Sequence, residues 1–134
     1  MNKIMLDTNI CIYLIKNKPM EVREKFNAFD VGEICVSSVT VSELYYGVSK
    51  STIPEKNEHA LRLFLAPLNI VEYGESSAIA YGKIRADLEA RGQVIGALDM
   101  MIAAHAFSLG VTLVTNNTRE FERVRGLVLE NWVQ

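Results

Sequence analysis

The sequence contains few of the residues that build disulfides or zinc sites. In 134 residues there are two cysteines, Cys11 and Cys35, and two histidines. Both cysteines lie in apolar segments without metal-type spacing, so we expect buried free thiols. No apolar run approaches the roughly 20 residues that span a bilayer, and the N-terminus leads straight into an apolar strand rather than a signal peptide. These absences predict a cytoplasmic protein without a membrane segment.

The chain also lacks an excess of positive charge. Fourteen Lys and Arg residues stand against sixteen Asp and Glu residues, a net charge of -2. The net charge therefore does not favour non-specific binding of nucleic acid. It is still compatible with a local basic surface.

Motifs for several enzyme classes are missing as well. There is no glycine-rich phosphate loop and no Ser or Cys nucleophile motif. Metal-free RNA cleavage needs a positioned general acid and base, and neither histidine suits that role. His59 lies in a charged helical pattern, and His105 lies in an apolar one, where a core histidine is expected.

Apolar runs and helical patterns alternate along the chain. Strand-like runs occupy residues 4–6, 34–37, 68–71, 112–115 and 127–129. The length suits one domain, which we expect to span residues 1–134. The alternation predicts an α/β fold in three layers, α/β/α, with a central, mainly parallel five-stranded sheet.

Proline and hydroxyl residues indicate where the earlier helices begin. Pro19 opens a helix that runs to about residue 29, and Pro54 opens another that runs to about residue 65. We expect Thr40 to cap the helix that carries Glu43.

Two further helices follow in the second half of the chain. Ser76 or Ser77 should cap an amphipathic helix that ends at Gly92, and we expect this helix to lie on the sheet surface. Residues 97–109 are apolar nearly all round, which predicts a central buried helix that Gly110 ends.

Four acidic residues lie in or beside segments that should be buried. Asp7 closes the first strand, Glu43 lies in the helix after the second, Asp99 opens the apolar helix, and Glu120 follows the fourth strand. Buried carboxylates are costly unless a cation binds them. Ligands of open parallel sheets bind beyond the carboxyl ends of the strands, so we expect all four acids to converge there. Singly, each has an ordinary alternative as a turn former, an N-cap or a surface residue.

The chemistry of these ligands favours a hard cation. An all-oxygen site suits Mg²⁺ or Mn²⁺ better than zinc, which prefers histidine or cysteine. Carboxylate-held Mg²⁺ can orient water for in-line attack on a phosphodiester and neutralise the developing charge. Hydrolysis of a nucleic acid is therefore the leading functional hypothesis.

Four segments together resemble the PIN-domain ribonucleases, and most closely the toxins of VapBC toxin-antitoxin systems. They are residues 5–9 (MLDTN), 37–44 (SSVTVSEL), 95–103 (IGALDMMIA) and 114–121 (VTNNTREF), and the resemblance extends to the ending at 127–132 (LVLENW). It implies a PIN-like fold and a Mg²⁺- or Mn²⁺-dependent endoribonuclease that a cognate VapB-type antitoxin inhibits. Asp7, Glu43 and Asp99 match the three best-defined acidic positions of the family.

The fourth acidic position departs from the family pattern. Many members carry Asp two residues after the strand-ending Thr, where this chain has Asn117, and we expect Glu120 to substitute from the next turn. One fully held ion with a weaker second site would fit this shift. Candidate groups that orient the carboxylates or metal-bound water are Thr8, Asn9, Ser38, Thr115 and Asn116. Simple cap and turn roles are the alternative for these five.

The resemblance also implies the partners. The chain most resembles enteric-type members, which are similar to enzymes that cut initiator transfer RNA in its anticodon loop. A single-stranded loop can expose its backbone to the metal site. Ordinary solvated charge is the alternative for each candidate phosphate contact: Lys16, Lys18, Lys83, Arg85, Arg91 and Arg119. Helices of residues 11–29 and 41–65 would form the antitoxin groove with Tyr13, Tyr45, Tyr46 and Phe64, unless these are core residues. A homodimer and a toxin-antitoxin hetero-oligomer are implied by resemblance alone.

Three other functions remain to be weighed. A phosphatase with Asp7 as nucleophile would need an acid at position 9, where Asn9 stands. A non-catalytic interaction module would use the acids to bind a structural ion. A deoxyribonuclease could use the same metal site, because metal-activated water serves both DNA and RNA.

Overall fold

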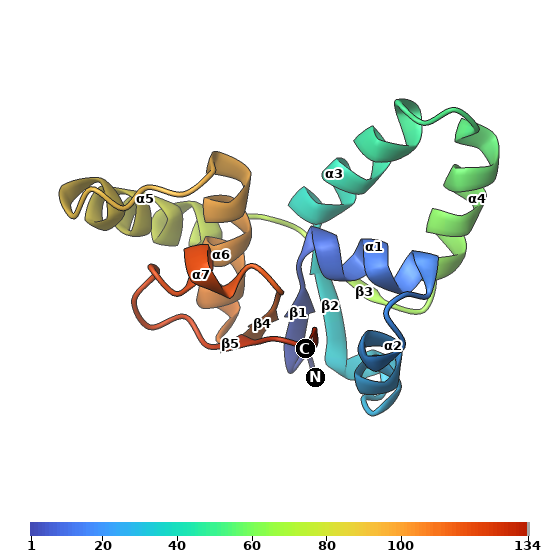
Figure 1. The fold of residues 1–134 in the computed structure, drawn as a ribbon. Coiled ribbons are helices and arrows are strands. Elements are labelled where there is room, and N and C mark those ends of the chain that lie inside the picture. The colour runs from blue at the N-terminus through green and yellow to red at the C-terminus, as the bar shows by residue number, and fades with distance from the viewer. Residues whose placement is uncertain (134) are drawn as a thin grey trace.

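Five parallel strands form one central sheet in the computed structural model, which describes residues 1–133 (Figure 1). The strand order is β3-β2-β1-β4-β5. The strands are β1 (Ile4–Leu6), β2 (Ile34–Ser37), β3 (Asn69–Val71), β4 (Thr112–Val114) and β5 (Leu129–Glu130). β1 is therefore the middle strand, paired with β2 on one side and β4 on the other.

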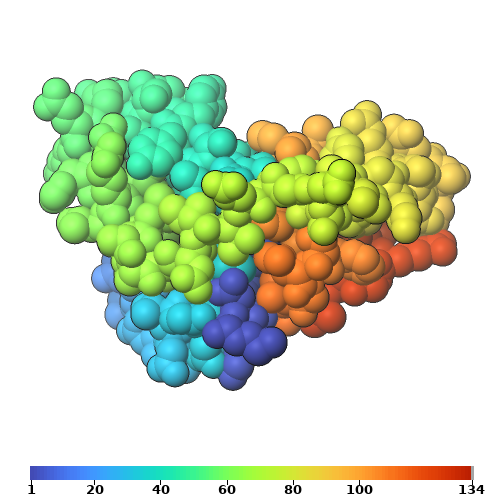
Figure 2. Space-filling model, turned by 180° about the vertical axis from the view of Figure 1, so that it is seen from behind, coloured from blue at the N-terminus to red at the C-terminus, as the bar shows by residue number. Residues whose placement is uncertain are grey.

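Helices cover both faces of this sheet, as the α/β/α prediction requires. They are α1 (Thr8–Lys16), α2 (Met20–Asn27), α3 (Ser38–Ser49), α4 (Pro54–Leu65), α5 (Glu75–Ala90), α6 (Ala97–Leu109) and the short α7 (Thr118–Phe121), with a 3-10 turn at Val31–Glu33. Figure 2 shows the segment between β3 and α5 crossing the back of the molecule, from the side of α3 and α4 to the side of α5 and α6.

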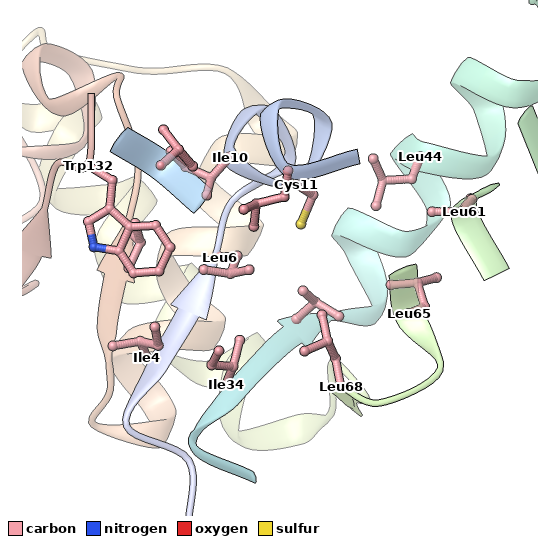
Figure 3. Close-up of a cluster of buried hydrophobic side chains, with 14 residues drawn as sticks. Ile4, Leu6, Ile10, Cys11, Ile34, Leu44, Leu61, Leu65, Leu68 and Trp132 are labelled. Carbon is pink, nitrogen blue, oxygen red and sulfur yellow. The ribbon is translucent and has the colours of Figure 1, made fainter. Parts of the chain in front are cut away.

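Alternating side chains of the strands divide the core into two layers. Ile4 and Leu6 of β1 join one buried cluster with residues of α1, α3 and α4 (Figure 3), while Met5 between them joins another with α6. Successive strand residues point to opposite faces, so a strand buried on both faces is apolar throughout. This is why residues 4–6 read as a continuous apolar run.

Trp132 closes the first cluster near the end of the described chain. Its ring is fully buried, stacks on Phe29 with the ring centroids 5.9 Å apart, and donates a hydrogen bond from Nε1 to Glu130. Burial of an aromatic ring of this size contributes about 3 kcal/mol or more to folding.

Three strand boundaries differ from the sequence prediction. β3 begins at residue 69 rather than 68, and β4 ends at residue 114 rather than 115. The prediction for the last strand, residues 127–129, was wrong by more, because β5 begins only at Leu129. The preceding turn at Gly126, with φ of 83°, keeps Leu127 bonded to the carbonyl of Val124, so ladder pairing starts later.

Two predicted helix caps were also wrong. Ser37 rather than Thr40 caps α3, because its Oγ accepts from the N–H of Val39 at 3.1 Å, and Thr40 is buried inside the helix. Gly74 rather than Ser76 or Ser77 precedes α5.

The predicted position of α5 on the sheet surface was wrong as well. α5 packs chiefly on α6, and α6 in turn contacts β4 and α3. α6 supplies the buried surface that α5 needs because it is apolar nearly all round, so a second helix can stack outside it. The expected end of α6 is confirmed, since Gly110 terminates it with φ of 69°.

Within residues 1–133, no helix is both long and apolar enough to cross a membrane.

Candidate metal centre

The sheet edge beyond the carboxyl ends of β1 and β4 is where the chain reverses its winding. From β1 the chain proceeds outward to β2 and β3, and it later returns to the other side of β1 to form β4 and β5. Such a reversal leaves a crevice between the helices that leave the two neighbouring strands. Asp7 directly follows β1 at this point, and Thr115 directly follows β4.

Asp7 is buried and hydrogen-bonded at this edge of the sheet. Its side chain is only 4% exposed, and Oδ1 accepts a hydrogen bond from the N–H of Ile10 at 2.9 Å, which makes Asp7 the N-cap of α1. Burial raises the pKa of Asp7 to about 6, and the charges of Asp99 and Glu43 push it in the same direction. Hydrogen bonds from Thr115 and Ile10 act against this rise because they favour the ionised form.

Asp99 approaches the same edge of the sheet from α6, because its charge acts on Asp7. It is the third residue of that helix, after Gly96 at the N-cap, so the ordinary reading of Asp99 as an N-cap does not apply. Burial raises the pKa of Asp99, followed by the negative charges of Glu43 and Glu120. Asp99 thus interacts with Asp7, Glu43 and Glu120, and Asp7 also interacts with Glu43.

Glu43 and Glu120 complete the cluster from α3 and α7. Glu43 lies in the sixth position of α3, deeper than the early position expected from a cap at Thr40. Thr8 fixes it, because the hydroxyl of Thr8 donates to Glu43 Oε1 at 2.6 Å. Glu120 is half-buried in the single turn of α7, which follows the turn formed by the N–H of Asn117 and Thr115 Oγ1 at 2.9 Å.

No basic side chain neutralises these acids in the part of the chain that the structure describes. The ion pairs among residues 1–133 involve other carboxylates: Glu33, Glu58, Glu89 and Asp87. As the side chains stand, no three His, Cys, Asp or Glu groups of this range are arranged to hold a metal ion. The donor chemistry of these acids, all-oxygen, partly buried and without a basic partner, nevertheless fits Mg²⁺ or Mn²⁺.

The five residues expected to orient the acids separate into two groups. Thr8 and Thr115 bond to Glu43 and Asp7. The other three do not contact the acids in the hydrogen bonds found within residues 1–133. Ser38 Oγ accepts from the N–H of Tyr73 at 3.0 Å, Asn116 Nδ2 donates to the hydroxyl of Tyr13 at 2.9 Å, and Asn9 is exposed on α1.

The candidate phosphate contacts fall at three separate places. Lys16 and Lys18 are exposed at the end of α1. Lys83 and Arg85 are exposed on α5, where Arg85 bonds to Glu89 and to the hydroxyl of Tyr81. Arg91 and Arg119 line one polar cavity together with two arginines that the sequence patterns did not single out, Arg123 and Arg125.

His105 occupies the core position expected for it. It is 1% exposed, its Nδ1 lies 2.7 Å from Ser37 Oγ, and its ring meets Tyr73 edge-on. Burial lowers the pKa of His105, so the imidazole is neutral at pH 7. This placement leaves it without a direct role at the carboxylate cluster.

An apolar groove of about 350 Å³ opens beside the cluster, between α1, α3 and α4. Glu43 and Lys16 lie on its lining with Ile12, Leu44, Gly47 and Leu61. Of the aromatic residues expected here, Tyr13, Tyr45 and Phe64 pack half-buried against the core, and Tyr46 is 67% exposed.

The raised pKa of Asp7 predicts how the metal-free protein responds to pH. The folded pKa of about 6 lies above the ordinary value of 3.8, so the folded state binds this proton more tightly and stability falls as pH rises from about 4 to 6. Asp7→Asn keeps the cap acceptor without the charge. At pH 8 with excess chelator, we expect its free energy of unfolding to exceed that of the wild type by up to about 3 kcal/mol.

Urea unfolding at pH 4 and pH 8 measures this difference. The gain should shrink at pH 4, and the exposed-site control Glu24→Gln should change stability little at either pH. An Asp7→Asn protein that is less stable than the wild type at pH 8 without metal would contradict the electrostatic cost assigned to Asp7.

Comparisons with known proteins agree with the fold and identify the family of the chain. Residues 4–127 match the model of the PIN domain family. The chain is 52% identical to the tRNA(fMet)-specific endonuclease VapC of Shigella flexneri over 132 residues, 98% of this chain and 99% of the relative. It is also 52% identical to ribonuclease VapC2 of Haemophilus influenzae, covering 99% of this chain and 100% of the relative.

Solved structures give the same grouping. A chain of the DNA-bound VapBC complex of Salmonella typhimurium superposes with a TM-score of 0.94 at 47% identity, covering 99% of this chain and 100% of the other. A chain of VapBC2 of Rickettsia felis, bound to a DNA fragment from its promoter, gives 0.92 at 41% identity with 97% and 98% covered. The chain therefore belongs to the PIN domain family and, within it, to the VapC ribonucleases.

Proposed function

We propose that this chain is a divalent-metal-dependent endoribonuclease that acts as the toxin of a type II toxin-antitoxin pair. The observation that carries the proposal is the cluster of four carboxylates at the sheet reversal, buried enough to raise the pKa of Asp7 and Asp99. No described lysine or arginine pairs with it. Its membership among the VapC ribonucleases supplies the reaction class.

Asp7, Glu43, Asp99 and Glu120 are the proposed ligands, with Mg²⁺ as the resident ion and Mn²⁺ as a substitute. When bound, such an ion activates water for attack on a phosphodiester and neutralises charge on the phosphate and leaving oxygen. Asp7, buried at the end of β1, and Asp99, half-buried in the first turn of α6, are the proposed inner pair. Glu120 lies farther along the chain from the family's usual position and supports a second, weaker site.

The surrounding groups of the chain hold the ligands in place. The N–H of Ile10 and the hydroxyl of Thr115 hold Asp7 in place and favour its ionised form, and the hydroxyl of Thr8 holds Glu43. Both threonines are thus positioning residues, since they act on the carboxylates rather than on the substrate. Protons on Asp7 and Asp99 must leave when a cation binds, so cation affinity rises with pH.

RNA is the proposed substrate, and initiator transfer RNA cut in the anticodon loop is the proposed target. The Shigella relative is named for tRNA(fMet), and about half of its residues are identical to this chain. Unpaired loop nucleotides can splay out and bring their backbone to a metal site at the protein surface. A deoxyribonuclease of the same site is the second candidate, and competition between an RNA loop and DNA of the same sequence separates the two.

The apolar groove between α1, α3 and α4 is the proposed seat of a VapB-type antitoxin. An amphipathic antitoxin helix would bury its apolar residues against Ile12, Leu44 and Leu61. Because Glu43 lies on the same lining, a basic antitoxin side chain at that end would pair with it and compete with the cation. We also propose that the chain forms one domain over residues 1–134 and that it assembles as a homodimer and as a hetero-oligomer with its antitoxin. The proposed location is the cytoplasm.

Charge removal at the inner pair should abolish cleavage. Asp7→Asn and Asp99→Asn should each lower RNA cleavage by at least about 100-fold while the fold persists, because the lost charge lowers cation occupancy. Cleavage of a labelled anticodon stem-loop, with circular dichroism as the fold check, measures both. Glu24→Gln is the charge-matched control and should cleave as the wild type does. Full activity in either folded variant, or in the wild type with excess chelator, would refute the mechanism.

Filling the groove should weaken antitoxin binding. A Cβ built at Gly47 meets no atom within 4 Å, so Gly47→Leu can fold while its side chain occupies the groove. We expect the affinity for the cognate antitoxin to fall by about tenfold or more, because loss of 1.4 kcal/mol corresponds to that factor. Calorimetric titration measures the change.

The matched control is Gly82→Leu. Gly82 lies exposed on α5, and a Cβ there also meets no atom within 4 Å. Both substitutions replace a helical glycine by leucine, so the gain in helix propensity is the same. Equal antitoxin affinities in the two variants would show that the antitoxin does not bind in the groove.

A further inference from the structure

A basic surface forms where the end of α5 meets the loop between α7 and β5. We call it the arginine patch and define it as Arg91, Arg119, Arg123 and Arg125 around a cavity of about 370 Å³. Gln93 and Glu122 complete its lining. Glu122 lies in the lining, Asp87 lies beside Arg91 and Arg125, and Glu120 adjoins Arg119, so the four arginines outnumber the three nearby acids in a chain whose net charge is -2.

Arg91 has a structural role in this patch, because its guanidinium is occupied by hydrogen bonds within the protein. Its Nη2 donates to Asp87 at 2.7 Å and to the backbone carbonyl of Arg123 at 2.6 Å, and its Nη1 donates to Gln93 at 2.9 Å. The guanidinium therefore ties the end of α5 to the loop. A side chain so fully engaged fixes the shape of the surface.

The other three arginines leave donors available to a ligand. Arg119 is exposed on α7, and the side chain of Arg125 is 73% exposed with only a 3.9 Å contact to Asp87. Arg123 is half-buried and spends one Nη on the carbonyl of Val94 at 3.3 Å. A guanidinium offers five N–H donors in a planar fork, which matches the oxygens of a phosphate group.

Both chain segments of the patch run directly into the carboxylate cluster. Arg119 is the neighbour of Glu120, and the segment from Arg91 leads through residues 92–98 to Asp99. Even a fully extended chain would keep Arg125 within about 18 Å of Glu120. A polyanion whose scissile phosphate lies at the acids would therefore meet the patch within a few nucleotides.

The electrostatics favour a nucleic acid over an acidic protein as the occupant. Four carboxylates at the cleavage site repel a polyanion. Positive charge next to that site would therefore raise the affinity for a polyanionic substrate. Repeated phosphates along one backbone can engage the spaced guanidinium groups of Arg119, Arg123 and Arg125 in turn. These contacts would orient the substrate without reading its sequence.

We propose that the arginine patch binds the sugar-phosphate backbone of the RNA on one side of the cleaved bond. This inference rests on the proposed function, because it assigns a surface to the substrate of that same site. Arg119 and Arg125 contact the RNA phosphates directly, and Arg91 is the positioning residue, because it fixes the loop that carries Arg123 and Arg125.

Equilibrium binding without metal tests the patch apart from catalysis. The probe is a fluorescently labelled transfer RNA anticodon stem-loop in excess chelator, followed by anisotropy from about 50 to 200 mM salt. The variant is the double substitution Arg119→Gln and Arg125→Gln, which leaves the Arg91 brace in place. The control is Lys56→Gln with Arg62→Gln on α4, which removes the same charge from exposed positions elsewhere.

The double variant should bind the RNA about tenfold more weakly at low salt. The slope of log Kd against log salt should flatten by about 1.5, because each lost phosphate contact removes roughly 0.7 to 0.9 of slope. A purely structural role would not change the salt slope in this way. Affinity and slope equal to those of the control would overturn the proposal, and so would unchanged RNA binding with loss of affinity for a short fluorescent polyglutamate peptide.

A parallel cleavage assay with Mg²⁺ separates this proposal from the proposed function. If the wild type, the control and the double variant all cleave the stem-loop with the same KM, RNA binding by the arginine patch is refuted. The proposed nuclease activity is then supported. If none of the proteins cleaves RNA while the binding difference persists, the nuclease proposal fails and the RNA-binding patch stands. Raised KM with unchanged kcat in the double variant supports both.

Discussion

The burial of Asp7 at the end of β1 is the constraint on which the rest of the site depends. A carboxylate that is 4% exposed loses hydration, and its pKa rises to about 6 despite hydrogen bonds from Ile10 and Thr115. The neighbouring charges of Glu43 and Asp99 increase the cost. In the proposed function a divalent cation offsets this cost, because it matches the oxygen ligands of the cluster. The metal-free protein is therefore expected to lose folding stability at Asp7, and the proposed cation would restore it.

Periodicity and position in the sequence were enough to predict the sheet and the place of the acids. Buried parallel strands are apolar on both faces, so residues 4–6 and 34–37 could be recognised without knowledge of their neighbours. The reversal of winding then assigns the carboxyl edge of β1 as the site. Caps were predicted less well, because Ser37, Ser38 and Thr40 all lie within reach of the start of α3. Only the end of β2 decides that Ser37 is the residue outside the helix.

The arginine patch could not be read from local sequence. Arg123 and Arg125 follow α7 in a polar stretch that resembles ordinary solvated surface, and their partners lie about thirty residues away on α5. The bond from Arg91 to the carbonyl of Arg123 involves a backbone acceptor, which leaves no trace in residue types. Such surfaces arise from tertiary packing of α5 on α6, and the sequence prediction had placed α5 on the sheet instead.

Metal binding at the sheet edge requires that the four carboxylates form one cation site. Diffraction from crystals grown with Mn²⁺, recorded for its anomalous signal, locates the ion directly. The account predicts a strong anomalous peak at coordinating distance, about 2 Å, from oxygens of Asp7 and Asp99, with Glu43 or Glu120 reached directly or through water. A Mn²⁺-loaded crystal whose anomalous peaks all lie away from these carboxylates would contradict it.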